Sequence, residues 1–363
     1  MKLKFLFFSF FIFFIIPVSS ALAVEAQPVV YYEKAIILEL KETINEISDF
    51  GQGMKSVQEI KIKILSGAHK GEEKVLENSI LGNPADLNIM KGDKVIIYLE
   101  KFEDDRLIIQ IHDYYRLPQI ILLVFIFFVL MILIGKAQGL RSIVSLLFSI
   151  FLIFKVFIPM ALKGFNPVWL SLVIASIISI TTLFIIAGFR KKTIAAILGT
   201  IGGLISAAIL AFVFTNLSRL SGLSSEEARI LASSFFLDFK GLLFSSIIIA
   251  ALGAVMDVAI SVASGIAEVK KANSEISRKK LISSGMEIGK DIIGTMSNTL
   301  IFAYVGASLF ILLLFTKFGD SYLKFFNFDF VAEEIIGAIS GSIGLILTVP
   351  ITAFFAGYLE SKK

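Results

Sequence analysis

The 363-residue sequence contains no cysteine and only two histidines, His69 and His112. The absence of cysteine excludes disulfides, thiolate metal sites and cysteine nucleophiles. Both histidines lie outside the long apolar segments, so neither can ligate haem in a bilayer, form an HExxH zinc site or activate a serine there. The sequence also lacks the glycine-rich loop of ATP-binding proteins. We therefore expect no metal, no cofactor and no enzymatic activity.

Charged residues are scarce as well, at 18% of the chain against 56% hydrophobic residues, and the mean hydropathy is +0.85. Ordinary soluble proteins are about 25% charged, so this composition predicts a polytopic membrane protein whose main partner is the lipid bilayer. The formal net charge is +4. Its basic residues gather in short loops at the ends of apolar segments, which is typical of membrane topology and gives no support to a nucleic-acid partner.

The first 26 residues have the pattern of a secretory signal peptide. Lys2 and Lys4 precede an apolar run over residues 5–16, and Pro17 and a small-residue stretch follow it. An uncleaved membrane anchor is the alternative interpretation. In both cases the residues that follow are expected outside the cytoplasm.

Residues 27–116 predict a separate extracytoplasmic domain that is entirely β. Apolar and polar residues alternate over five segments of strand length, and glycine-rich turns separate them. A hairpin turn is expected at residues 103–105. A small barrel of the OB or SH3-like type would satisfy this pattern. The predicted strands are 35–40, 59–65, 74–77, 94–100 and 106–112.

Residues 117–363 predict a membrane domain of seven transmembrane helices, because seven apolar segments are each near the length that spans a bilayer. With the N-terminal domain outside, the loops on the cytoplasmic side hold 13 Lys and Arg and the outer loops hold six. This bias predicts a cytoplasmic C-terminus. The predicted spans are 119–135, 143–158, 168–188, 194–214, 242–267, 292–315 and 335–358.

Two of these segments carry polar residues at helical spacing, and they form the predicted site. On the fifth segment Asp257 shares one face with Ser261, Ser264 and Glu268, while on the sixth Asp291, Thr295 and Asn298 share a stripe. An ionised carboxylate at the bilayer centre costs about 2.5–3.5 kcal/mol, so Asp257 needs protein or water around it. We expect the two stripes to face each other and to bind an ion or a small solute. Interhelical hydrogen bonding without a ligand remains the alternative.

Glycine predicts close helix packing at Gly253, and at Gly337, Gly341 and Gly344 on the seventh segment. Lys155, near the outer end of the second segment, is a candidate counter-ion for Asp257. Between the fourth and fifth segments, Ser224 and Glu227 have the spacing of a capping box, which predicts a short helix at the membrane surface.

The segments 250–269 (AALGAVMDVAISVASGIAEV) and 289–306 (GKDIIGTMSNTLIFAYVG) resemble the YibE/YibF family of bacterial membrane proteins. The resemblance extends over most of the chain. It implies a multi-pass protein of the bacterial cytoplasmic membrane whose functional core lies in these two segments. It implies an architecture and not a reaction.

Two functions are compatible with these features. The first is a permease or secondary transporter of a small solute or ion, with its pathway between the fifth, sixth and seventh helices. The second is a non-transporting accessory or structural envelope protein whose β domain binds a partner. A homo-oligomer is a candidate assembly in either case. An aspartate protease is disfavoured because Asp291 is expected at a helix start, where a carboxylate is stabilised by the helix dipole.

Overall fold

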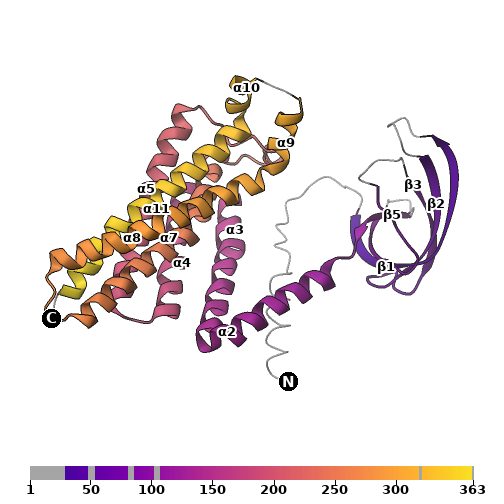
Figure 1. Cartoon of the computed structure of the whole chain (residues 1–363). Coiled ribbons are helices and arrows are strands. Elements are labelled where there is room, and N and C mark those ends of the chain that lie inside the picture. The colour runs from indigo at the N-terminus through magenta and orange to yellow at the C-terminus, as the bar shows by residue number, and fades with distance from the viewer. Residues whose placement is uncertain (1–28, 48–53, 81–85, 102–106, 319–320, 362–363) are drawn as a thin grey trace. The chain divides into compact units, whose positions relative to one another are not determined.

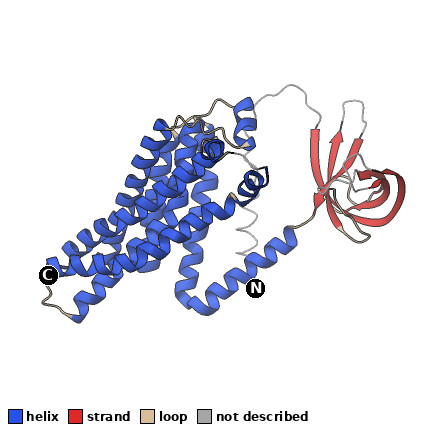
Figure 2. Cartoon of the chain, turned by 45° about the horizontal axis from the view of Figure 1, so that its top comes forward, coloured by secondary structure: helices blue, strands red, loops and turns tan. Residues whose placement is uncertain are grey.

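The computed structural model describes residues 29–47, 54–80, 86–101, 107–318 and 321–361. The predicted signal peptide and the predicted turn at residues 103–105 lie outside these ranges. The chain divides into two compact units, Met1–Val129 and Leu130–Lys363. In Figure 2 all strands belong to the first unit, and the second unit is helical.

The β domain is an antiparallel half-barrel of five strands in the order β3-β2-β1-β4-β5 (Figure 1). Each of the five predicted strands is present, and most are longer than predicted. β1 pairs with β2 and with β4 in antiparallel register, so one long strand supports both halves of the sheet. The strands are β1 (Val29–Ile47), β2 (Met54–Ile64), β3 (Glu73–Ile80), β4 (Lys94–Lys101) and β5 (Leu107–Tyr114).

The alternation that predicted these strands also builds their core. Ala35 and Ile37 of β1, Ile60 and Ile62 of β2 and Ile97 of β4 are buried together, while the residues between them face outward. Period-two alternation places every second side chain on the same face of a sheet. Two polar side chains join the interior. The buried Glu33 accepts a hydrogen bond from the backbone N–H of Ala68 at 3.0 Å, and the buried Gln58 accepts one from the side-chain amide of Asn78 at 3.3 Å.

The second unit and the segment leading into it consist of helices and one π-helical turn (Figure 1). Apolar runs define the long helices, and the side chains of Asn166, Ser225, Asp238 and Ser321 cap the starts of four helices. Their bounds are α2 (Leu117–Leu152), η1 (Ile153–Phe157), α3 (Ile158–Leu162), α4 (Pro167–Ala187), α5 (Lys191–Leu217), α6 (Glu226–Ser234), α7 (Phe239–Ala272), α8 (Arg278–Ala307), α9 (Leu309–Phe318), α10 (Tyr322–Phe326) and α11 (Asp329–Ser361).

Among the described residues, five helical segments are long and apolar enough to cross a membrane, or six if the bent pair α8 and α9 is one span. This count differs from the seven predicted because the first two predicted spans are counted together as one helical segment, Leu117–Leu162. That segment breaks at Lys136, where φ is 48° and ψ is −129°. A Cβ on Gly139 would collide with the carbonyl oxygen of Met131, so the chain bends sharply at this break.

Two connections also differ from the prediction. The predicted cytoplasmic loop over residues 270–290 is mostly helix, since α7 continues to Ala272 and α8 begins at Arg278. Its charged residues lie on helical turns that extend beyond the apolar part. In the predicted outer connection α6 is present, but its N-cap is Ser225, whose side chain accepts from the N–H of Ala228 at 3.2 Å. The predicted cap, Ser224, instead donates its hydroxyl hydrogen bond to the carboxylate of Glu333.

α11 is the element around which the second unit packs, because it contacts α5, α7 and α8. Glycines allow these close approaches. A Cβ on Gly344 would lie 2.6 Å from the Cβ of Ala207, and one on Gly341 would lie 3.1 Å from Leu300 Cδ2. Gly337 lies similarly against the ring of Tyr304. Small residues at such crossings let helix backbones come together in a membrane protein.

Candidate functional site

The polar stripe of α7 lies on the outer surface of the helical unit. Asp257, Ser261 and Glu268 are exposed, Ser264 is half-buried, and a Cβ placed on Gly253 would meet no atom within 4 Å. The opposite side of the same helix is fully buried at Val255, Val258, Val262 and Ile266. The small and polar face of α7 is therefore the one that the other described helices leave mostly uncovered.

The polar stripe of α8 has the same character. Asp291, Thr295 and Asn298 are exposed, and a Cβ on Gly294 would meet nothing within 4 Å. Asp291 is the fourteenth residue of a helix that begins at Arg278, so the expectation that it caps a helix start is wrong. Its carboxylate is not stabilised by an N-terminal helix dipole.

Both stripes border one seam, the line along which α7 packs on α8. Gly265 of α7 meets Ile288 of α8, where a Cβ on the glycine would lie 2.6 Å from Ile288 Cδ1. At 100° per residue, Gly265 lies about 80° around α7 from Asp257, and Ile288 lies about 60° around α8 from Asp291. Going round each helix from its polar stripe, the contacts with α11 come after the α7–α8 contact. Gly341 of α11, for example, meets Ala251 of α7 and Leu300 of α8. We infer that both stripes lie on the side of the seam away from α11.

The depths of the two stripes also agree. With a rise of 1.5 Å per residue, Asp257 lies about 12 Å above the contact between Gly265 and Ile288, and Asn298 lies about 15 Å above it. Thr295 lies at about 10 Å on the same scale. The carboxylate of α7 is thus level with the hydroxyl and amide of α8.

Three of the stripe residues have identifiable partners, whereas the described part of the chain provides none for the side chains of Ser261 and Asp291. The Nζ of Lys192, on α5, donates to the Oγ of Ser264 at 3.2 Å. Glu268 forms an exposed ion pair with Lys271 at 3.8 Å. The Oγ1 of Thr295 donates to the carbonyl of Ile292 at 3.1 Å. Glu268 is thereby explained as an ordinary surface ion pair at the inner end of the helix.

Asp257 and Asn298 differ from these residues. Within the described part of the chain, neither side chain forms a hydrogen bond or an ion pair. The predicted counter-ion Lys155 lies in the π-helical turn η1, which packs against α4, and it does not pair with Asp257. A carboxylate and an amide near the middle of two apolar helices are thus left for a ligand, water or another chain.

The matched sequence families cover nearly the whole of this architecture. Residues 123–362, which include both stripes, match the YibE/F-like protein family, and residues 30–114 match the YibE/F family N-terminal domain. The chain belongs to the YibE/F-like family. Neither the curated proteins nor the solved structures give a match.

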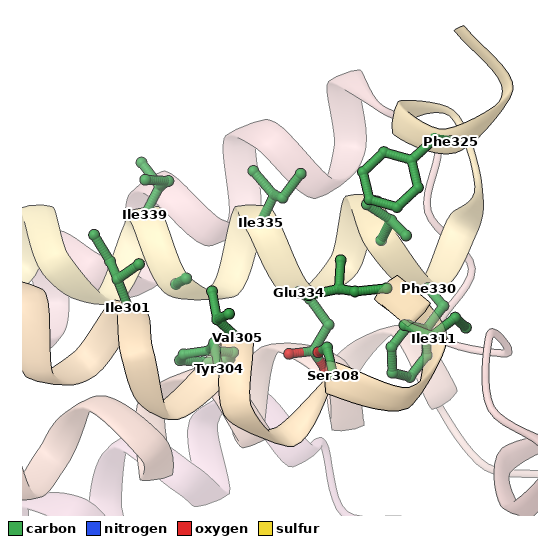
Figure 3. A pocket seen from close by; sticks show the side chains of 13 residues that line it. Ile301, Tyr304, Val305, Ser308, Ile311, Phe325, Phe330, Glu334, Ile335 and Ile339 are labelled. Atoms are coloured by element: carbon green, nitrogen blue, oxygen red, sulfur yellow. The ribbon is translucent and has the colours of Figure 1, made fainter. Parts of the chain in front are cut away.

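In this YibE/F-like protein, α8 ends in a break that the sequence did not predict. α8 and α9 meet at an angle of 62° around Ser308, inside the segment that was expected to be one straight span. The Oγ of Ser308 is buried. The carboxylate of Glu334, on α11, points toward that hydroxyl but lacks the geometry of a hydrogen bond (Figure 3).

Glu333 and Glu334 are the residues that sequence reasoning missed. Glu333 is buried, and its carboxylate accepts hydrogen bonds from the backbone N–H of Gly222 at 3.2 Å and from the hydroxyl of Ser224. It therefore ties the outer connection to the start of α11. Glu334 lines a cavity of about 200 Å³ with Tyr304, Ser308 and apolar side chains of α8 to α11 (Figure 3). The signal was present, since two adjacent carboxylates directly precede the predicted span at 335–358.

Proposed function

We propose that this YibE/F-like protein is a permease or secondary transporter of a small cation or small polar solute in the bacterial cytoplasmic membrane. The observation that carries the proposal is the pairing in depth of Asp257 with Thr295 and Asn298 beside one seam. The ligand binds along these two stripes. Asp257 supplies the charge, and Thr295 and Asn298 supply oxygen and amide groups.

The chemistry of the stripes fits this role. A carboxylate in mid-membrane is costly and is typical of ion pathways and proton relays in transport proteins. Small residues lie on the same stripes, and Gly253 and Gly294 leave open space beside α7 and α8. Carboxylate, hydroxyl and amide oxygens are the ligands that hard cations prefer. This site replaces the pathway expected between the fifth, sixth and seventh helices, because tight contacts fill the interface of α11 with α7 and α8.

The break between α8 and α9 supports the same function. Non-helical backbone at membrane depth is tolerated where it is buried in protein or lines a water-filled cavity. Discontinuous helices are a common device of secondary transporters. The 62° bend lies on the helix that carries Thr295 and Asn298, so movement at the bend would shift one side of the site relative to the other.

The topology follows the charge distribution. The β domain, as a small barrel of the OB or SH3-like type, lies outside the cytoplasm, and the C-terminus lies inside. With the break at Lys136 taken as a turn between two membrane crossings, and with α8 and α9 taken as one broken span, the chain crosses the bilayer seven times. Lys136 and Arg141 then lie at the cytoplasmic side, as basic residues of short loops do.

A second candidate function is an accessory envelope protein, and one observation favours it. Three aromatic side chains lie together on the outward-facing side of β1, β4 and β5. The rings of Tyr32 and Tyr98 are 5.7 Å apart, and those of Tyr32 and His112 are 5.1 Å apart. Exposed aromatic clusters are enriched at protein interfaces. In this function the β domain binds an envelope partner and the helices serve as its anchor.

Flux measurements separate the two functions. The full-length protein is reconstituted into liposomes, and uptake of protons, Na⁺ and K⁺ is followed in turn with ion-selective dyes under an imposed potential. A permease for one of these cations should produce flux above that of empty liposomes. Absence of flux for all three, together with capture of an envelope protein by the β domain, would favour the accessory function.

A further inference from the structure

The open side of the α7–α8 seam needs a cover that the described residues of one chain do not provide. Asp257, Ser261, Thr295 and Asn298 are all exposed on the surface of the helical unit. An ionised carboxylate facing lipid at this depth costs about 2.5–3.5 kcal/mol, and the unpaired amide of Asn298 adds to that cost. These side chains should therefore be covered by protein or by water that protein encloses.

The surface around the seam is complementary to itself. α7 contributes the acceptor Asp257, and α8 contributes the donor Asn298, at depths that differ by about 3 Å. A two-fold axis along the membrane normal preserves depth. It would lay the α7 stripe of one copy over the α8 stripe of the other, and the reverse contact would form at the same time. Such an isologous interface closes on itself as a dimer.

We propose that a second copy of this chain packs on the α7–α8 seam and completes the site around Asp257. The partner copy brings its own Thr295 and Asn298 to the carboxylate. The site in one chain is incomplete without it, because no described residue covers the exposed side of Asp257. This inference concerns the same site as the proposed function and names its partner.

Packing favours a second helix pair over lipid as the cover. Gly253 and Gly294 lie on the two stripes, and a Cβ at either position would meet no atom of its own chain within 4 Å. Glycine and serine on one helix face let a second backbone approach closely, which is the usual basis of helix association in membranes. Large apolar side chains, which suit lipid, dominate other surfaces, as at Ile209 and Phe212 of α5.

Cross-linking in membranes tests the interface, and the absence of native cysteine makes single replacements clean. Two differently tagged full-length copies are co-expressed, one with Ser261→Cys and the other with Gly294→Cys. Their positions lie about 6 Å and 9 Å above the contact between Gly265 and Ile288. A short bis-maleimide should join the two tags. The matched control replaces Ser261→Cys by Ile209→Cys, an exposed position on α5, and should give no hetero-tagged product.

A second measurement separates loss of the interface from loss of the fold. Gly253→Leu should convert a two-copy particle in nanodiscs into a single copy while helical content and yield stay unchanged, because its own chain offers open space there. Gly341→Leu is the contrast, since it should reduce the yield of folded protein. Single copies for the wild type, or cross-linking at Ile209→Cys equal to that at Ser261→Cys, would overturn the dimer. Neither measurement reports flux, so the dimer and the proposed transport function are tested independently.

Discussion

The ammonium group of Lys192 lies 3.2 Å from the hydroxyl oxygen of Ser264 and places a positive charge of α5 at the inner end of the α7 stripe. Seven residues separate Ser264 from Asp257, which is about 10 Å along the helix. At that separation, two unit charges interact by roughly 0.4–1.7 kcal/mol for an effective dielectric constant between about 80 and 20. Lys192 should therefore oppose cation binding at Asp257.

Replacement of this lysine tests whether the two residues share one site. In the liposome assay, Lys192→Gln should tighten the apparent affinity for the transported cation by about two- to seventeenfold. Lys271→Gln is the control, because Lys271 is an exposed cation engaged with Glu268. Equal effects of the two substitutions would indicate a general change in surface potential.

The packing of α11 predicts opposite responses at two glycines. Gly344→Val should destabilise the helical unit by about 1–3 kcal/mol, because its side chain would overlap Ala207 and the carbonyl of Gly203. Gly253→Ala should leave the stability of the single chain unchanged or raise it by up to about 1 kcal/mol, since alanine favours helix and meets no described atom of its own chain within 4 Å. Thermal unfolding in detergent measures both. Similar losses at the two positions would contradict the open face of α7.

The β domain should show a carboxylate-dependent loss of stability in acid. The guanidinium of Arg116 lies 2.5 Å from Asp113 and lowers the pKa of that carboxyl, with a further contribution from the N–H of Tyr114. A carboxyl whose pKa is lower in the folded state stabilises the fold above its unfolded pKa of about 3.9 and loses that effect as the pH falls through the folded value.

Urea unfolding of residues 27–116 between pH 6 and pH 2 tests this linkage. The midpoint of Asp113→Asn should lie below that of the wild type near pH 6, and the difference should shrink toward pH 2. Adding Arg116→Gln to that variant should cause little further loss. The wild-type fragment of residues 27–116 should also be soluble and rich in β-structure. A helical circular-dichroism spectrum would refute the independent β domain.

Orientation in the membrane can be read from two introduced cysteines. Ser274→Cys lies in the short connection between α7 and α8, and Ser221→Cys lies in the connection before α6. In intact cells an impermeant maleimide should label the second position and not the first, because basic residues flank Ser274. Labelling of Ser274→Cys from outside would reverse the predicted topology.

The helices and strands were predicted from the sequence more accurately than the contacts between them. Alternation identified all five strands, because burial of one face fixes the period of a sheet. Helical spacing grouped Asp257 with Ser261 and Thr295 with Asn298, because residues three and four apart share a face. It could not reveal which face the rest of the chain covers. Small and polar residues suit both a buried interface and an exposed surface. The two stripes were therefore predicted to face each other, whereas in the structure both are exposed beside the α7–α8 seam.

Other differences have local causes. Hydropathy ends a predicted span where charge begins, so the helical turns from Lys270 to Lys290 were assigned to a loop, and Glu333 and Glu334 were left outside the last span. Backbone hydrogen bonding continues through such residues when a helix extends past the membrane. The break at Lys136 directly follows Gly135 and falls between the predicted spans 119–135 and 143–158. The bend at Ser308 lies inside one predicted span and has no glycine or proline at the break itself, so the usual sequence signal of interruption was absent there.

The flux of reconstituted Asp257→Asn protein tests the central claim most directly. Asparagine keeps the shape of the side chain and removes its charge, so the variant should fold and insert normally while cation flux falls by about tenfold or more. Glu268→Gln, which removes the exposed carboxylate paired with Lys271, should retain wild-type flux. A well-folded Asp257→Asn protein with wild-type flux would contradict the assignment of Asp257 to the transport site.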